Sequence, residues 1–164
     1  MHIRPTIVAA LIPLLLAGCR QADGPMPQAS GEVPNRLSDI SRDLQSVARG
    51  DMQARQDLAD DVSVFAADEK EPRQAVNELS RRTAEVVDGS RLTDQSAQRL
   101  AHQLWTAASA RELSQRQVET LQGEMHGLLV EIGVPEERAE NVAAQVAEVQ
   151  RLVSRRSKRW YEVF

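Results

Sequence analysis

The sequence predicts an all-α fold, a bundle of about five or six amphipathic helices over residues 35–164. Apolar residues recur every three or four positions from Asn35 onward, as they do on one face of a helix. Hydrophobic residues make up 41% of the 164 residues but aromatic residues only 3%. The core must therefore be aliphatic, which suits helices better than a β-sandwich. The eight glycines and seven prolines gather at candidate helix boundaries.

Six apolar stripes indicate the helices. They occupy residues 37–47, 58–65, 76–86, 97–104, 118–132 and 142–153. The stripes also share a register, because six of their residues lie 21 positions apart: Leu37, Leu58, Leu79, Leu100, Leu121 and Val142. Two interpretations stay open. One is a duplicated helical unit, and the other is six helices of similar length with short loops, since 21 residues are also three heptads.

Start and stop signals divide these stripes. Asp51 and Thr93 are residue types that begin helices, and Gly133 is a typical helix end. Ser114 with Gln117 predicts a capping box. Residues 107–112 nevertheless contain good helix formers and neither glycine nor proline. The segment 94–132 is therefore predicted as one helix or as two.

The first 18 residues have the three parts of a secretory signal peptide. Arg4 supplies a positive start, and residues 6–16 form an apolar run that is too short to span about 30 Å of hydrocarbon. Two small residues, Ala17 and Gly18, then precede the only cysteine, Cys19. We expect cleavage between Gly18 and Cys19.

The four residues Leu16-Ala17-Gly18-Cys19 resemble the lipobox of bacterial lipoproteins. The resemblance implies that the Cys19 thiol receives a diacylglycerol and that the new amino group is acylated. Two or more acyl chains hold a protein stably on a membrane. Arg20 follows, rather than the aspartate that marks inner-membrane retention in enterobacterial lipoproteins, which favours an outer-membrane anchor facing the periplasm. The alternative is an ordinary signal peptide followed by an incidental cysteine.

A linker follows the expected anchor. Residues 20–34 hold three prolines and two glycines and have no apolar periodicity. Such a composition is typical of a flexible connection. We therefore expect residues 19–34 to be a lipidated cysteine with its linker, and residues 35–164 to be the helical domain.

Charge is distributed unevenly along the chain. Residues 19–150 carry 14 basic and 23 acidic groups, a net charge of −9. This balance argues against nucleic acid as a partner, because phosphate contacts need a basic face. The last fourteen residues instead hold five basic groups against one acidic group.

The basic tail is a candidate contact for an anionic surface. Arg151, Arg155 and Arg159 are spaced to share one face of a helix, and Trp160 adds an amphipathic ring of the kind found at bilayer interfaces. The alternative is a helix end whose cations complement its negative pole while the aromatic residues cover the core.

Catalytic and metal-binding signatures are not found in the sequence. His102 and His126 remain after processing, and neither has a histidine, cysteine or acid four residues away. HExxH, phosphate-loop and GxSxG patterns are also missing. The adjacent acids Asp60 and Asp61 point about 100° apart on a helix and are expected to be solvated charges. We expect no enzyme activity, cofactor or metal.

One short phrase resembles a second family. Residues 113–117, Leu-Ser-Gln-Arg-Gln, are similar to the LTxxQ phrase of small periplasmic helical chaperones and stress sensors. A second copy at residues 92–96 has Ser96 where glutamine is expected. The favoured function is a binding, scaffold or accessory protein of the cell envelope with an envelope protein as partner. The resemblance implies the alternative, a chaperone or sensor that binds unfolded protein.

Overall fold

The structure, a computed structural model, describes residues 32–66, 70–110 and 113–159, with side chains over residues 33–153 of these ranges. The described part is all-helical, so the predicted bundle of about six helices is confirmed. The helices are α1 (Glu32–Ala48), α2 (Met52–Ser63), α3 (Lys70–Val87), α4 (Asp94–Ser109), α5 (Gln115–Glu131) and α6 (Glu136–Arg159). No described helix has the length and apolar character needed to cross a membrane.

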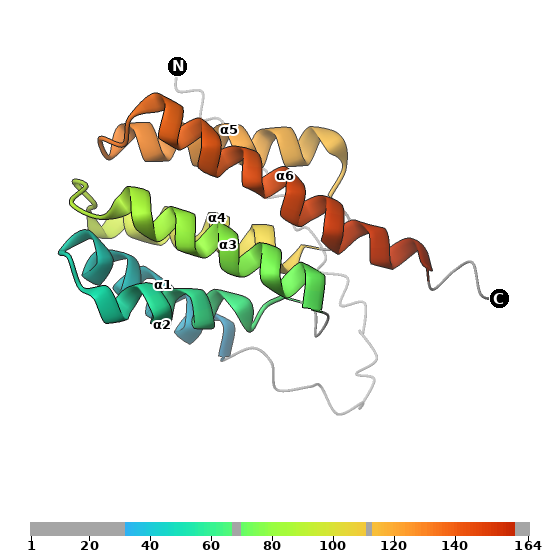
Figure 1. The fold of residues 1–164 in the computed structure, drawn as a ribbon, viewed down its shortest axis with the longest axis horizontal. Coiled ribbons are helices and arrows are strands. Elements are labelled where there is room, and N and C mark those ends of the chain that lie inside the picture. Colours follow the sequence, from blue (N-terminus) through green and yellow to red (C-terminus); the bar gives the residue numbers. More distant parts are fainter. Residues whose placement is uncertain (1–31, 67–69, 111–112, 160–164) are drawn as a thin grey trace, which may run out of the picture.

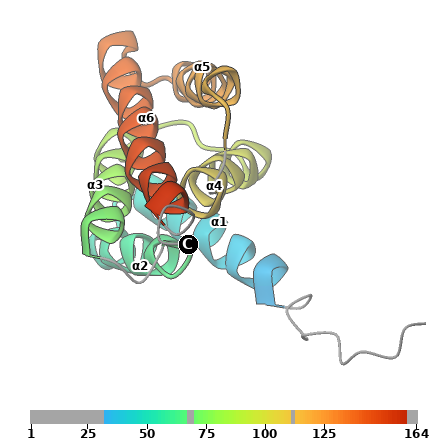
Figure 2. The same cartoon turned by 90° about the vertical axis from the view of Figure 1, so that its right-hand side faces the viewer.

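The helices form two adjacent rows. One row contains α2, α3 and α6, and the other contains α1, α4 and α5 (Figures 1 and 2). The rows are joined at one edge where α1 packs on α2, and at the other where α5 packs on α6. Each helix runs antiparallel to the next one in the chain, so connections alternate between the two ends of the bundle (Figure 1).

This topology gives the bundle two different ends. The three connections α1–α2, α3–α4 and α5–α6 lie together at one end, which we name the turn end. The start of α1 and the end of α6 both lie at the opposite end, which we name the terminal end (Figure 1). An even number of antiparallel helices has this consequence.

The turn end is held together by bonds between its connections. The backbone N–H of Gly89 donates to the carbonyl oxygen of Ala48 at 3.2 Å, and that of Arg91 donates to Ile132 at 3.0 Å. Each connection also contains a glycine with positive φ, as at Gly133 with φ 96°. Because residues with a Cβ rarely adopt this conformation, glycine ends these helices at low cost.

The core is aliphatic, as its composition predicted. Of the six residues that lie 21 positions apart, five are buried and Leu37 is half-buried. One buried polar side chain, Gln150 of α6, crosses between the rows, and its Nε2 donates to the carbonyl oxygen of Ala107 in α4 at 2.7 Å. A hydrogen bond of this kind satisfies a carbonyl that the end of α4 would otherwise leave unpaired.

Three predicted boundaries are resolved. The segment 94–132 is two helices, and Ser114 begins the second with the predicted capping box, in which the Gln117 side chain accepts from the Ser114 N–H at 2.9 Å. Asp51 and Thr93 are N-caps. The first helix begins at Glu32, so residues 32–34 belong to α1 and not to the linker. Pro34 is compatible with this because the first helical turn needs no N–H donor there.

Candidate functional site

The residues of the expected lipid anchor lie outside the described residues. This applies to Gly18 and Cys19, and also to Trp160 of the tail. Residues 20–31 separate Cys19 from the first residue of α1. The segment before α1 and the segment after α6 therefore join the bundle at the same end, the terminal end (Figure 1).

The basic tail is partly described. Helix α6 continues to Arg159 and so includes all three arginines of the tail. Their spacing of four residues places positions 151, 155 and 159 on one face of this helix. Arg151 is exposed, and its Nε donates to Glu148 at 2.7 Å. This hydrogen bond raises the pKa of Arg151. The side chains of Arg155 and Arg159 lie outside the described ones.

The two histidines lie apart. His102 is exposed on α4, and its ring centroid is 5.4 Å from that of Trp105, whose ring is nearly perpendicular to that of Phe65. His126 is half-buried on α5. Within the described ranges, no three side chains among His, Cys, Asp and Glu are grouped so that they could hold a metal ion.

An acidic seam between α1 and α2 is the cluster that sequence reasoning missed. It consists of Asp39 and Asp43 on α1, and Asp57 and Asp61 on α2. The atom Oδ2 of Asp43 is buried and has no hydrogen-bond partner. Burial raises the pKa of Asp43 to about 6, and the neighbouring charges of Asp61, Asp57 and Asp39 act in the same direction.

Asp61 corrects one expectation from the sequence. Its neighbour Asp60 is exposed and accepts from the Gln56 side chain at 3.1 Å, as a solvated charge should. Asp61 itself is half-buried and faces α1, where burial and then the charge of Asp39 raise its pKa. Acids four residues apart on both helices are visible in the sequence. Their meeting depends on how α1 and α2 pair, which no local pattern reports.

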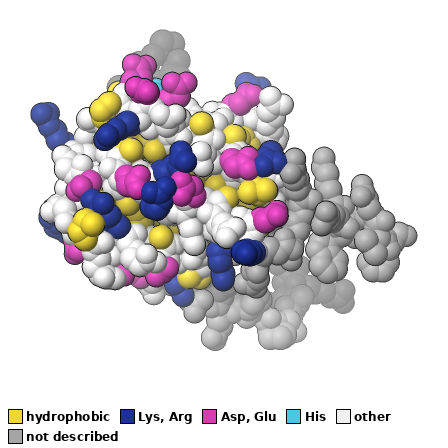
Figure 3. All heavy atoms as spheres, viewed as in Figure 1, with side chains coloured by type: hydrophobic (Ala, Val, Ile, Leu, Met, Phe, Trp, Pro, Cys, Tyr) yellow, Lys and Arg dark blue, Asp and Glu magenta, His cyan; other side chains and the backbone are white. Residues whose placement is uncertain are grey.

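The surface also has hollows between helices. One of about 520 Å³ lies between α1 and α4 and includes Leu37, Ser41 and Gln98 in its lining. Others of about 390 Å³ and 510 Å³ lie between α3 and α6. Basic and acidic side chains are mixed over the face of α3 and α6, with apolar side chains between them (Figure 3).

Pairing within α3 neutralises part of this charge. Glu78 accepts hydrogen bonds from Arg81 at 2.8 Å and from Arg82 at 2.6 Å. These bonds, that from Arg81 first, lower the pKa of Glu78. The face of α3 therefore carries paired charges of both signs rather than an excess of one sign.

No protein-family model matches the chain, and the searches of curated proteins and of solved structures gave no significant match. The class of the described part therefore rests on its own architecture, a six-helix bundle of two antiparallel rows with an aliphatic core.

Proposed function

We propose that the chain is a lipid-anchored helical binding or scaffold protein of the bacterial cell envelope, facing the periplasm. The observation that carries the proposal is the sequence Leu16-Ala17-Gly18-Cys19 at the end of an apolar run, on the only cysteine of the chain. A single free thiol in an exported protein risks unwanted disulfides, and lipidation removes that thiol. Arg20 favours the outer membrane.

The form of the domain supports a binding role. The helices carry large polar faces, and the hollows on them lie along helix seams. The partner would be an envelope protein, since the acidic balance of residues 19–150 argues against nucleic acid.

The alternative, a chaperone or stress sensor that binds unfolded protein, depends on the phrase at residues 113–117. Ser114 and Gln117 form a capping box in the structure, as do Thr93 and Ser96 at the related phrase. Local helix capping is thus sufficient to explain these residue types, and the phrase gives the alternative little support.

Mass spectrometry of the protein isolated from its native envelope tests the anchor. We expect a mature chain that begins at Cys19 and carries a diacylglycerol and an amide-linked acyl chain. Cys19→Ser is the matched control, and it should abolish the lipid mass. A bare thiol, or an N-terminus at any other residue, would refute the proposal.

Cross-linking in the native envelope tests the binding role. A scaffold should cross-link to one defined protein in stoichiometric yield, and a chaperone should instead suppress the aggregation of an unfolding client. Aggregation suppression without a defined partner would favour the alternative.

A further inference from the structure

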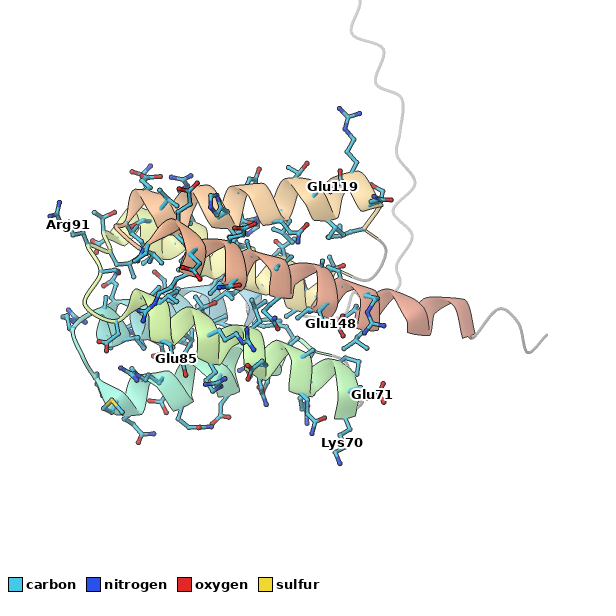
Figure 4. The ribbon with its side chains drawn as sticks, turned by 45° about the horizontal axis from the view of Figure 1, so that its top comes forward. Lys70, Glu71, Glu85, Arg91, Glu119 and Glu148 are labelled. Atoms are coloured by element: carbon cyan, nitrogen blue, oxygen red, sulfur yellow. The ribbon has the colours of Figure 1, made fainter. Side chains whose placement is uncertain are left out.

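Acids lie at both ends of the bundle, since Figure 4 shows Glu71 and Glu119 at the end opposite Arg91. The connections of the turn end, residues 49–51, 88–94 and 132–137, hold more acids than bases. The bases are Arg49 and Arg91, and the acids are Asp51, Asp88, Asp94, Glu136 and Glu137. Figure 4 shows Arg91 at this end, and Lys70 and Glu71 at the terminal end.

The terminal end receives the most basic part of the chain. Residues 151–159 of α6 hold five basic groups and no acid, and this stretch is helical to Arg159. In Figure 1 the last turns of α6 extend beyond the neighbouring helix α3. The basic turns therefore lie next to the end from which the chain leads back to residue 19.

A tether alone would not orient the domain. Twelve residues, 20–31, separate Cys19 from α1, and a fully extended chain of that length reaches about 40 Å. A domain on such a tether can present any face to the bilayer unless a second contact selects one. Charges act on a membrane surface only within about one Debye length, roughly 10 Å near 0.1 M salt.

We propose that the terminal end is a membrane-docking surface, in which the last turns of α6 contact the anionic headgroups of the bilayer that holds the lipid anchor. The inference rests on the proposed lipid anchor. The occupant is a bilayer because topology brings the anchored segment and the basic turns to one end, and because cations near a membrane surface are attracted by anionic headgroups. The domain then stands upright, with the turn end directed away from the membrane and available to a partner.

Two exposed apolar residues, Met52 at the start of α2 and Val64 directly after its end, give a matched pair of probes. Met52 at the turn end is 68% exposed and Val64 at the terminal end is 51% exposed. Their twelve-residue separation corresponds to about 18 Å along a helix axis. Each is changed singly to cysteine, Met52→Cys and Val64→Cys, and labelled with a fluorophore. Because lipid occupies the sulfur of Cys19, the introduced thiol is the only reactive one.

The processed lipoprotein is placed in phosphatidylcholine vesicles that contain phosphatidylglycerol and a quencher attached to a lipid headgroup. We expect several-fold stronger quenching at residue 64 than at residue 52. The difference should shrink in vesicles of phosphatidylcholine alone and at high salt. Equal quenching at both positions would overturn the proposal, and stronger quenching at residue 52 would show the opposite orientation.

Charge variants test which residues orient the domain. One variant changes the tail cations to glutamine at Arg155, Arg156, Lys158 and Arg159. Its control changes two cations of the turn end, Arg49 and Arg91, in the same way. The tail variant should lose the difference in quenching and the control should keep it. A difference that survives in the tail variant would overturn the role of α6. Mass spectrometry of the same samples reports the anchor separately, so loss of orientation with lipid present contradicts only the docking surface.

Discussion

Replacing Asp43 with asparagine should stabilise the protein at neutral pH, although it removes a native charge. The carboxylate of Asp43 lies in the seam between α1 and α2 with Oδ2 buried and unpaired. Burial and the nearby aspartates raise its pKa from 3.8 to about 6. A shift of about two units corresponds to an upper limit of roughly 3 kcal/mol. Because solvent partly screens this half-buried group, we expect Asp43→Asn to add about 1 kcal/mol near pH 7.

The contribution of Asp43 to the free energy of unfolding changes with pH in a definite direction. A raised pKa means that the folded state binds the proton of Asp43 more tightly than the unfolded state does. Between pH 3.8 and about 6 the folded state holds more protons at this site, so its contribution to the free energy of unfolding grows as the pH falls through this window. Glu78, whose pKa is lowered, contributes in the opposite direction. The difference between variant and native protein is therefore the informative quantity.

Urea denaturation followed by far-ultraviolet circular dichroism measures the free energy of unfolding of the variant and of the native protein. The advantage of Asp43→Asn should be largest at about pH 7 and should nearly vanish at about pH 4. Glu140→Gln is the control, because Glu140 is an exposed acid on α6, away from the seam. The control should change stability little and equally at both pH values. A gain for Asp43→Asn that is absent at pH 7, or that is the same at both pH values, would refute the electrostatic account of the seam.

Four further changes test the packing and the turns, each by urea denaturation. Gln150→Ala should cost about 2 kcal/mol, because it leaves the buried carbonyl of Ala107 without its donor; a cost near zero would mean that the bond contributes nothing. Gly133→Ala should destabilise by about 1 kcal/mol, because its φ of 96° strains any residue with a Cβ, whereas Gly123→Ala on the exposed face of α5 should stabilise by up to about 1 kcal/mol. The same sign for both glycines would contradict this assignment. Leu100→Ala, at a fully buried position, should cost about 2–5 kcal/mol, and a smaller loss would place Leu100 outside the core.

The features that could be predicted from the sequence are those that depend on one helix at a time. Burial of Leu58, Leu79 and Leu121 follows from helical spacing, because an amphipathic helix must bury its apolar stripe. The caps at Thr93 and Ser114 follow from side chains that satisfy free N–H groups of the first turn. Local chemistry does not reveal which helices become neighbours.

The features that could not be predicted all depend on those neighbours. The bond from Gln150 to Ala107 spans 43 residues and requires that α6 cross α4. The raised pKa of Asp43 requires that α2 pack on α1, which buries the carboxyl and brings the charges of Asp61 and Asp57 near it. Glutamine and aspartate have ordinary roles on an exposed helix face, so neither residue type signals its pairing in advance. The motif of the candidate anchor, by contrast, is local and can be recognised in the sequence, and its residues lie outside those that the structure describes.

The positions of the turns bear on whether the 21-residue register reflects a duplicated helical unit or six helices of similar length. A duplicated helical unit should repeat its connection as well as its apolar frame. The positive-φ glycines lie at residues 50, 89 and 133, which are separated by 39 and 44 residues and mark only the connections at the turn end. The frame also fails at polar positions, because Gln150 is buried where Leu129, 21 residues earlier, is apolar. Helices of similar length, each with its apolar stripe directed at one shared core, account for the register without a repeated unit.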